Sequence, residues 1–325
     1  MKTIPNNNKV TSTSASLLPP ANKYLDAVEQ WKINNLTGTD NIYSLLKDYL
    51  LHNNNNDDET NNNNGTVAAV NTTTTRPTIS SSGTIDRISI TQLATDKVVH
   101  ELTSLYEDYT FITAKDASLT DDFRRRLQDP DNFQHSDDSL VYGEIDLRGF
   151  CNLLLDNDIT LLSSSSSQHD SEGRGRGVFY DLGSGSGRAV FAARFLGDYD
   201  TVIGIELLSN LHQLAQSVQS LYKFQYQHKL QHRHVQFVES DLLDYDWSDG
   251  TVVYIPCLLF DTNMMKKIAS HAIKLQRGAY VISLKKFAGD NVDHDECFQD
   301  AFELTKQQVV TMSWGDSNVY VYKRR

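Results

Sequence analysis

The stretch that decides the fold is Phe179-Tyr180-Asp181-Leu182-Gly183-Ser184-Gly185-Ser186-Gly187-Arg188. A strand-like run over 178–182 leads into three alternating glycines, and a helical pattern follows over 188–196. Glycines at such a turn let backbone N–H groups approach a ligand closely, and the helix N-terminus adds the positive end of a dipole. A dinucleotide loop needs G-x-G-x-x-G, and position 188 holds Arg instead of the third glycine. Asp181 ahead of the glycines suits a ligand with an ammonium group rather than a pyrophosphate.

Two further acids follow the next two predicted strands. Glu206 ends the strand predicted over 201–206, 19 residues after Gly187, where an acid in doubly wound folds binds ribose hydroxyls. Asp241, followed by Leu242, comes after the third strand, where a carboxylate can accept from an adenine amino group. Taken alone, Glu206 also fits a helix N-terminal acid and Asp241 a turn residue. Together, acceptors for ammonium, ribose and adenine at three successive strand ends describe a site for S-adenosylmethionine.

Strand and helix patterns alternate through the C-terminal half of the chain. Strands are predicted over 178–182, 201–206, 235–238, 251–255, 279–284, 309–313 and 318–322, and helices over 147–155, 188–196, 208–226 and 264–275. Alternation of this kind indicates βαβ units and a parallel sheet. The last two strands flank a short turn with Gly315, which is a hairpin signal. The predicted fold class is α/β: a doubly wound, mainly parallel seven-stranded sheet with a C-terminal antiparallel hairpin, preceded by a small helical region.

The chain divides into three parts. Residues 1–20 are polar and predicted to be a disordered tail, and 21–138 form a helical region with apolar residues at helical spacing over 23–33, 40–51 and 91–109. An Asn/Thr/Ser insert at about 53–84 interrupts that region and has too little apolar surface to fold. Residues 139–325 form the predicted catalytic domain, which includes a Ser/Gly linker at about 163–177.

Composition excludes several classes of protein. The 325 residues contain no apolar run of about 18, so no membrane-spanning helix is expected. Met1 to Pro20 lacks the apolar block of a secretory signal. Cys151, Cys257 and Cys297 have no CxxC spacing, which argues against a thiolate zinc site or a disulfide scaffold and fits an intracellular protein.

The net charge and the spacing of the histidines indicate which binding partners are not expected. Thirty Lys and Arg against 42 Asp and Glu give a net charge of −12, which argues against a broad nucleic-acid-binding face. His228 and His232 stand at i and i+4, but no third ligand follows in a recognisable motif, so no metal is expected.

The glycine loop resembles motif I of class I S-adenosylmethionine-dependent methyltransferases. More narrowly, it is similar to the DLGSGxG loop of the nucleosomal histone-lysine methyltransferases named for disruption of telomeric silencing. Val141-Tyr142-Gly143-Glu144 matches that family's YGE segment, which lies over the methionine end of the cofactor, and the likeness covers about 139–325. The resemblance implies the cofactor S-adenosyl-L-methionine, a protein substrate such as a histone or nucleosome, and a nuclear location, with the cytoplasm left open. It implies cofactor contacts from Tyr142, Gly143, Glu144, Asp181, Gly183, Ser184, Gly185, Gly187, Glu206, Asp241 and Leu242.

The acceptor end departs from the family in two places. Ile145 stands where the family has Thr, and Pro256 and Cys257 stand where it has two Asn residues lining the lysine channel. A narrow apolar channel would favour a neutral amine over an ammonium, because desolvation penalises the charged form. The candidate walls are Tyr142, Tyr254, Phe260 and Trp314, each of which also fits a plain core position, and no residue is predicted as a general base.

Two alternatives to a histone-lysine methyltransferase remain at this stage. The chain is also consistent with a class I methyltransferase acting on another protein or on a small molecule, or with a cofactor-binding interaction module that has lost catalysis. Cys257 follows Pro256 as the nucleophile of a cytosine-C5 methyltransferase does, but its neighbours are Leu258, Leu259 and Phe260. Such a nucleophile needs a lowered thiol pKa. Apolar neighbours would raise the pKa of this thiol, so a buried structural cysteine is predicted instead.

Overall fold

The computed structural model describes residues 87–121, 140–156, 159, 177–197, 199–226, 233–287, 296–312 and 314–325. The predictions for 1–20, 23–33, 40–51, 53–84 and 163–176, and for His228 and His232, lie outside the described residues.

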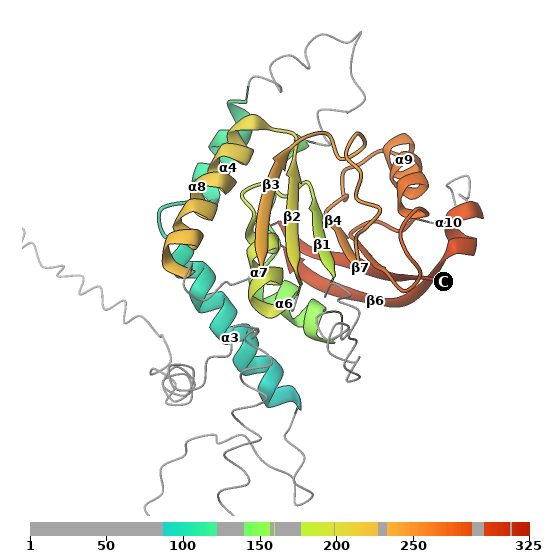
Figure 1. Cartoon of the computed structure of the whole chain (residues 1–325), viewed down its shortest axis with the longest axis horizontal. Helices are drawn as coiled ribbons and strands as arrows, with labels where there is room; N and C mark the ends of the chain where they lie inside the picture. The colour runs from blue at the N-terminus through green and yellow to red at the C-terminus, as the bar shows by residue number, and fades with distance from the viewer. Residues whose placement is uncertain are drawn as a thin grey trace, which may run out of the picture.

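A seven-stranded sheet forms the centre of the described structure, with the strand order β3-β2-β1-β4-β5-β7-β6 (Figure 1). The strands are β1 (Val178–Leu182), β2 (Thr201–Glu206), β3 (His234–Glu239), β4 (Val252–Ile255), β5 (Tyr280–Ser283), β6 (Phe302–Met312) and β7 (Gly315–Arg324). The first five strands are parallel, and the β6–β7 hairpin joins the sheet through antiparallel pairing of β7 with β5. The predicted fold class, including the seven strands and the C-terminal hairpin, is confirmed.

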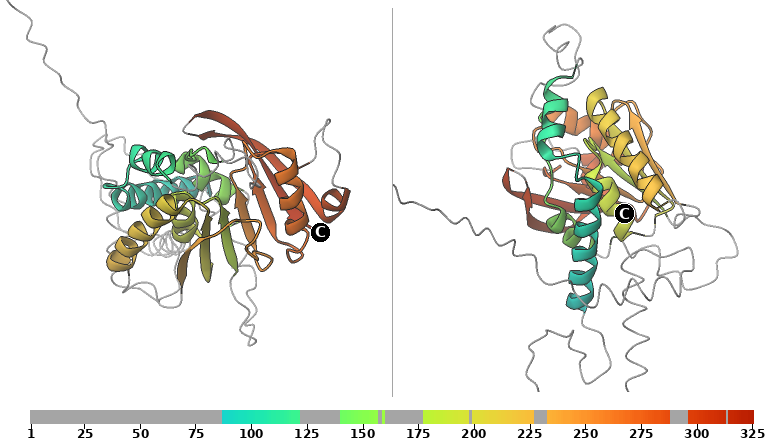
Figure 2. Two further views of the ribbon diagram at one scale, coloured as in Figure 1. Left: turned by 90° about the horizontal axis from the view of Figure 1, so that it is seen from above. Right: turned by 90° about the vertical axis from the view of Figure 1, so that its left-hand side faces the viewer.

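Helices cover both faces of the sheet. They are α3 (Arg87–Leu105), α4 (Phe111–Leu119), α6 (Leu147–Asp156), α7 (Arg188–Leu196), α8 (Ser209–Tyr226), α9 (Thr262–Ala272) and α10 (Glu296–Ala301). Alternate side chains of one strand enter different cores: Phe179 belongs to the core that includes residues of α3, α6, α7 and α8, whereas the adjacent Tyr180 belongs to the core that includes residues of α9 and α10. Figure 2 shows α4 and α8 side by side, with α3 extending beyond them.

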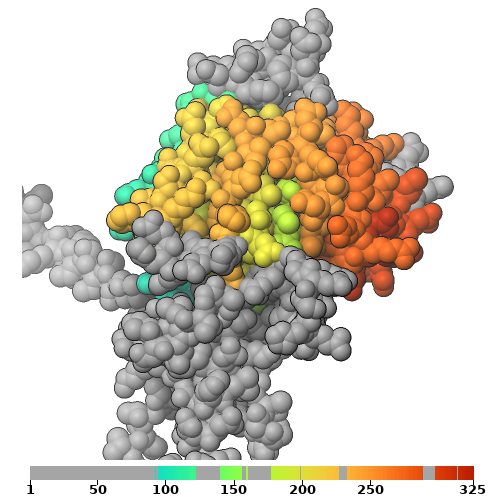
Figure 3. All heavy atoms as spheres, viewed as in Figure 1, coloured from blue at the N-terminus to red at the C-terminus, as the bar shows by residue number. Residues whose placement is uncertain are grey.

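On the face seen in Figure 3, yellow and orange segments form most of the described surface, yellow-green atoms lie between them near the centre, and the red C-terminal segment lies at the right-hand edge. Within the described ranges, none of the helices has the length and apolar content needed to span a bilayer.

Several boundaries differ from the predictions for identifiable reasons. The helix predicted over 91–109 ends at Leu105, and a turn leads into α4, which was not predicted. Thr110 caps α4 by accepting a hydrogen bond from the N–H of Thr113. The helix predicted over 264–275 begins at Thr262, because Asp261 accepts from the N–H of Met264, and it ends at Ala272. The short helix α10 was also not predicted.

Candidate active site

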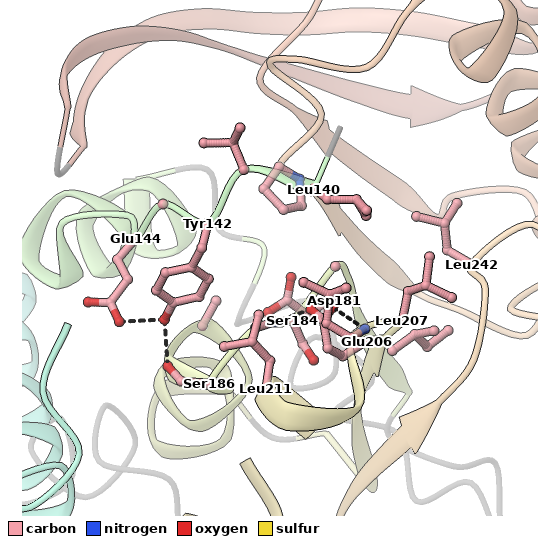
Figure 4. Close-up of a pocket in the computed structure, with 18 of the residues that line it drawn as sticks. Leu140, Tyr142, Glu144, Asp181, Ser184, Ser186, Glu206, Leu207, Leu211 and Leu242 are labelled. Atoms are coloured by element: carbon pink, nitrogen blue, oxygen red, sulfur yellow. Dashed lines mark hydrogen bonds between the residues drawn. The ribbon is translucent and has the colours of Figure 1, made fainter. Parts of the chain in front are cut away.

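A pocket opens at the C-terminal ends of β1, β2 and β4, where the strand order reverses on the two sides of β1 and β4. This crevice is where open α/β sheets bind their ligands. In Figure 4, Tyr142 and Glu144 lie on one side, Asp181, Ser184 and Glu206 gather at the centre, and Leu242 lies on the other side. The structure brings together in its lining all but one of the predicted cofactor contacts: Tyr142, Gly143, Glu144, Asp181, Gly183, Ser184, Gly185, Glu206, Asp241 and Leu242.

The exception is Gly187, which is not part of the pocket lining. It is the N-cap residue of α7 with φ 90°, a left-handed conformation that favours glycine. A Cβ atom there would lie 2.5 Å from Cζ of Phe237. Gly187 is therefore explained by close packing at the start of the helix.

Asp181, at the end of β1, carries an unsatisfied carboxylate. Its side chain is buried, and its Oδ1 atom has no hydrogen-bond partner among the described residues. Burial, and then the charge of Glu206, raises the pKa of Asp181 well above its ordinary value. The buried Oγ atom of Ser184 also lacks a partner in the described part of the chain. A buried acceptor of this kind fits the ammonium of an amino acid, which supplies both charge and donors.

Glu206, at the end of β2, holds the glycine loop. Its Oε2 atom accepts a hydrogen bond from the N–H of Gly185 at 2.7 Å, and its Oε1 atom accepts from the N–H of Leu208 at 2.9 Å. Burial raises the pKa of Glu206, and these backbone donors oppose that rise. A carboxylate has about four lone-pair sites, so acceptor capacity remains for ribose hydroxyls. The contact with ribose stays a prediction.

Asp241 and Leu242 form the far side of the pocket, after β3. Asp241 accepts a hydrogen bond from the N–H of Leu243 at 2.8 Å through Oδ1, which fixes the turn in which it stands. Leu242 is almost fully buried while it lines the pocket. A carboxylate beside an apolar wall suits a flat ring with an exocyclic amino group, such as adenine.

Residues 140–146, which we call the Tyr142 loop, cover the other side of the pocket. The Oη atom of Tyr142 lies 2.5 Å from Oε1 of Glu144 and 2.9 Å from Oγ of Ser186. Arg188 donates from Nε to the same Glu144 oxygen at 2.9 Å. Burial and the neighbouring carboxylate raise the pKa of Tyr142, so its hydroxyl stays protonated. Ser186 and Arg188 were not predicted, although an Arg in the first turn of a helix, where the dipole disfavours cations, is a signal that could have drawn attention to it.

The four predicted acceptor-channel residues all line this pocket: Tyr142, Tyr254, Phe260 and Trp314. Trp314 stands at the tip of the β6–β7 hairpin, is 47% exposed, and packs so tightly on Gly143 that a Cβ atom there would lie 2.0 Å from its ring. Tyr254, by contrast, is buried and packs on Phe150 with ring centroids 5.0 Å apart.

Cys257 is buried and does not line the pocket. Its Sγ atom lies 3.0 Å from Oγ of Ser283. Burial raises the pKa of the Cys257 thiol, which is the opposite of what a nucleophile needs. The prediction of a buried structural cysteine is confirmed. In the described residues, no group of three or more His, Cys, Asp and Glu side chains is arranged to hold a metal ion.

Comparison with known protein families shows to which family the chain belongs. The model of the family described as histone methylation protein DOT1 matches residues 158–322, just over half of the chain. The Tyr142 loop, α3 and α4 lie before the matched range. A search of curated proteins found no match.

Solved structures with a similar fold include an RNA methyltransferase from Salinibacter ruber in complex with S-adenosyl-L-homocysteine. It is 22% identical with a TM-score of 0.32, over 46% of this chain and 80% of that chain. An M1A22 tRNA methyltransferase from B. subtilis is 12% identical with a TM-score of 0.34, over 46% and 60%. These identities and TM-scores are too low to support a function for this chain. The family match, in contrast, agrees with the glycine loop and with the buried carboxylate of Asp181 beside it. The chain belongs to the DOT1 family of histone methylation proteins and is an S-adenosylmethionine-dependent methyltransferase.

Proposed function

We propose that this chain methylates a lysine side chain of a histone presented within a nucleosome, and that the pocket at the end of β1 is the active site. The observation that carries the placement is the buried Asp181 carboxylate, whose Oδ1 atom is unpartnered among the described residues. An acid of this kind destabilises the ligand-free protein, and a bound ammonium would compensate that cost.

In this proposal the cofactor lies across the C-terminal ends of β1, β2 and β3, with its methionine part at β1 and its adenine at β3. Asp181 receives the ammonium of the methionine part, Glu206 the ribose hydroxyls, and Asp241 the adenine amino group. Leu242 packs against the adenine ring. Gly183 leaves room for the ligand, since a Cβ atom there would meet nothing closer than Pro256 at 3.8 Å.

S-adenosylmethionine, when bound, supplies a methyl group on a positively charged sulfur as the electrophile. The protein contributes alignment and the exclusion of water. Tyr142, Phe260 and Trp314 form the walls of the acceptor end, and Tyr254 closes it from the core side. An unperturbed lysine has a pKa of about 10.4, and these apolar walls favour the neutral amine that attacks. No side chain is assigned as a general base.

Charge supports a protein acceptor over a free nucleic acid. The net charge of −12 repels phosphates and attracts basic histone segments, so the proposed contact with a nucleosome is made through its histones rather than through its DNA. A histone substrate in chromatin implies a nuclear protein, which is part of the proposal.

Methyl transfer from radiolabelled S-adenosylmethionine tests the function directly. Whole nucleosomes, free histones and a nuclear lysate are each incubated with the parent chain and with Asp181→Asn as the matched control. The proposal predicts label on a histone of the nucleosome that is absent with Asp181→Asn, and mass spectrometry identifies the lysine. Label on another protein or on a small molecule would overturn the histone proposal, and cofactor binding without any label would indicate an interaction module.

A further inference from the structure

Arg188 is the strongest feature of the site that the proposed function leaves unused. It is the first residue of α7, directly after the glycine loop, and it is one of the residues that line the pocket. A cation at this end of a helix faces the positive end of the dipole, which is unfavourable. Contacts made elsewhere must offset that cost.

The side chain contacts three residues in two segments, the Tyr142 loop and the turn between α3 and α4. Its Nε atom donates to Oε1 of Glu144 at 2.9 Å, and a terminal nitrogen donates to the carbonyl of Tyr109 at 3.0 Å. Its guanidinium lies 4.2 Å from the ring centroid of Tyr106. The ion pair with Glu144 is largely buried, with side-chain exposures of 16% for Arg188 and 14% for Glu144. A planar fork that donates in two directions while it stacks on an aromatic ring is a geometry that Arg provides and Lys does not.

Two more contacts connect the region around the turn between α3 and α4 to the glycine loop and to the Tyr142 loop. The hydroxyl of Tyr106 donates to the carbonyl of Ser186 in the glycine loop at 2.7 Å. Phe111, at the start of α4, stacks on Tyr142 with ring centroids 5.9 Å apart. The turn between α3 and α4 therefore packs on both the glycine loop and the Tyr142 loop.

From this arrangement we propose that Arg188 is a positioning residue, which locks the Tyr142 loop to the turn between α3 and α4 and so sets the affinity for the cofactor. The inference rests on the proposed function, since it takes the Tyr142 loop to lie over the cofactor. It adds that the charge of Glu144 is already paired with Arg188, whereas Asp181 has an oxygen with no partner among the described residues and can receive the ammonium. It also gives α3 and α4, which lie before the family match, a part in binding.

Steady-state kinetics of the full chain with varied S-adenosylmethionine test this role. For Arg188→Gln we expect KM for the cofactor to rise by about tenfold or more, with kcat changed by less than about threefold, because the interaction acts on binding and not on methyl transfer. Arg188→Lys keeps the ion pair but not the fork, so its KM should lie between the two. Arg277→Gln, an exposed Arg after α9, carries the same charge change and should match the parent.

A double-mutant cycle distinguishes the interaction between Arg188 and Glu144 from a general destabilisation of the protein. If Arg188 acts through Glu144, the effect of Glu144→Gln on KM should be much smaller in the Arg188→Gln background than in the parent. Additive effects of the two substitutions, or a parental KM in Arg188→Gln, would overturn the inference.

Calorimetry of S-adenosyl-L-homocysteine with Arg188→Gln and with Asp181→Asn measures binding without turnover, and the inference predicts a loss of affinity of about tenfold or more in Arg188→Gln. The two variants together distinguish a failure of the role of Arg188 from a failure of the cofactor placement. Undiminished affinity in Asp181→Asn would refute the cofactor placement itself. Lost affinity there, combined with a parental KM in Arg188→Gln, would refute the role of Arg188 alone.

Discussion

Glu206 and Gly185 are joined by a hydrogen bond of 2.7 Å from the loop N–H to the carboxylate, so the acid at the end of β2 shapes the glycine loop after β1. One side chain thereby prepares the loop and presents its remaining acceptor sites to the pocket. This links the stability of the loop to the affinity for the ligand, and the link can be measured.

Replacing Glu206 with Ala should weaken both folding and binding. The substitution leaves two buried backbone N–H groups without their acceptor, which costs about 1–3 kcal/mol for each group. Thermal denaturation should show a lower melting temperature, and calorimetry a loss of affinity for S-adenosyl-L-homocysteine of about tenfold or more. Glu206→Gln keeps one acceptor oxygen and should fall between Glu206→Ala and the parent. Parental stability in Glu206→Ala would contradict the role given to the hydrogen bonds.

Replacing Asp181 with Asn should raise the stability of the ligand-free protein at neutral pH. Burial raises the pKa of Asp181 above its ordinary value, so the folded state binds this proton more tightly than the unfolded state does. Its contribution to stability is then fully present below the ordinary pKa of Asp and is lost as the pH rises through the raised pKa. Denaturation across pH should show the parent losing stability in this window relative to Asp181→Asn, and parallel curves would argue against an unpaired buried carboxylate.

The same raised pKa predicts the pH dependence of binding. Protonation of Asp181 competes with an ammonium, so the affinity of the parent for S-adenosyl-L-homocysteine should fall as the pH drops through the raised pKa. Because the pKa is raised, the loss should begin at a higher pH than an ordinary Asp would give. Calorimetry in a series of buffers measures the profile, and an affinity that does not fall toward acid pH would be inconsistent with the assignment.

Gly185 should tolerate no side chain. Its φ is 53°, and a Cβ atom would lie 2.5 Å from Cε2 of Tyr142, so Gly185→Ala must displace the Tyr142 ring and Gly185→Arg should abolish cofactor binding. Gly278→Ala is the matched control, since it also has a positive φ, 88°, but meets nothing within 4 Å. Both Ala variants bear a conformational cost of about 1 kcal/mol, but only Gly185→Ala should lose affinity. Equal affinities in calorimetry would refute the placement of the loop.

Cys257 should be dispensable for methyl transfer. Its thiol is buried against Ser283 and does not line the pocket, so Cys257→Ala should keep most of the activity and lower the melting temperature modestly. The radiolabel assay measures the activity. Complete loss of activity in a folded Cys257→Ala protein would indicate that Cys257 is a nucleophile after all.

Local patterns were enough to predict much of the fold. The bounds of β1, β2 and α7 match the prediction because an apolar run, a glycine loop and a helical pattern follow one another without interruption. Helix α4 was missed because its sequence, FITAKDASL, buries only Ala114 and Ser118 and shows no apolar stripe. Element type could therefore be predicted where the burial pattern is periodic.

The residues of the site also fall into those that local sequence patterns could predict and those that they could not. The three acids could be predicted because each stands at the end of a strand, and parallel strands bring their ends to one edge. The contacts of Arg188 with Tyr106 and Tyr109 join residues about 80 positions apart in the sequence, and they depend on how α3 packs on α7. No local pattern encodes such a contact.

A crystal structure of the full chain with S-adenosyl-L-homocysteine would show directly whether Asp181 binds the ammonium of the cofactor. We predict that the ligand ammonium lies about 3 Å from the Asp181 carboxylate, with the ribose at Glu206 and the adenine beside Leu242. A ligand bound in the opposite direction, or a crevice that stays empty at saturating ligand, would contradict this prediction.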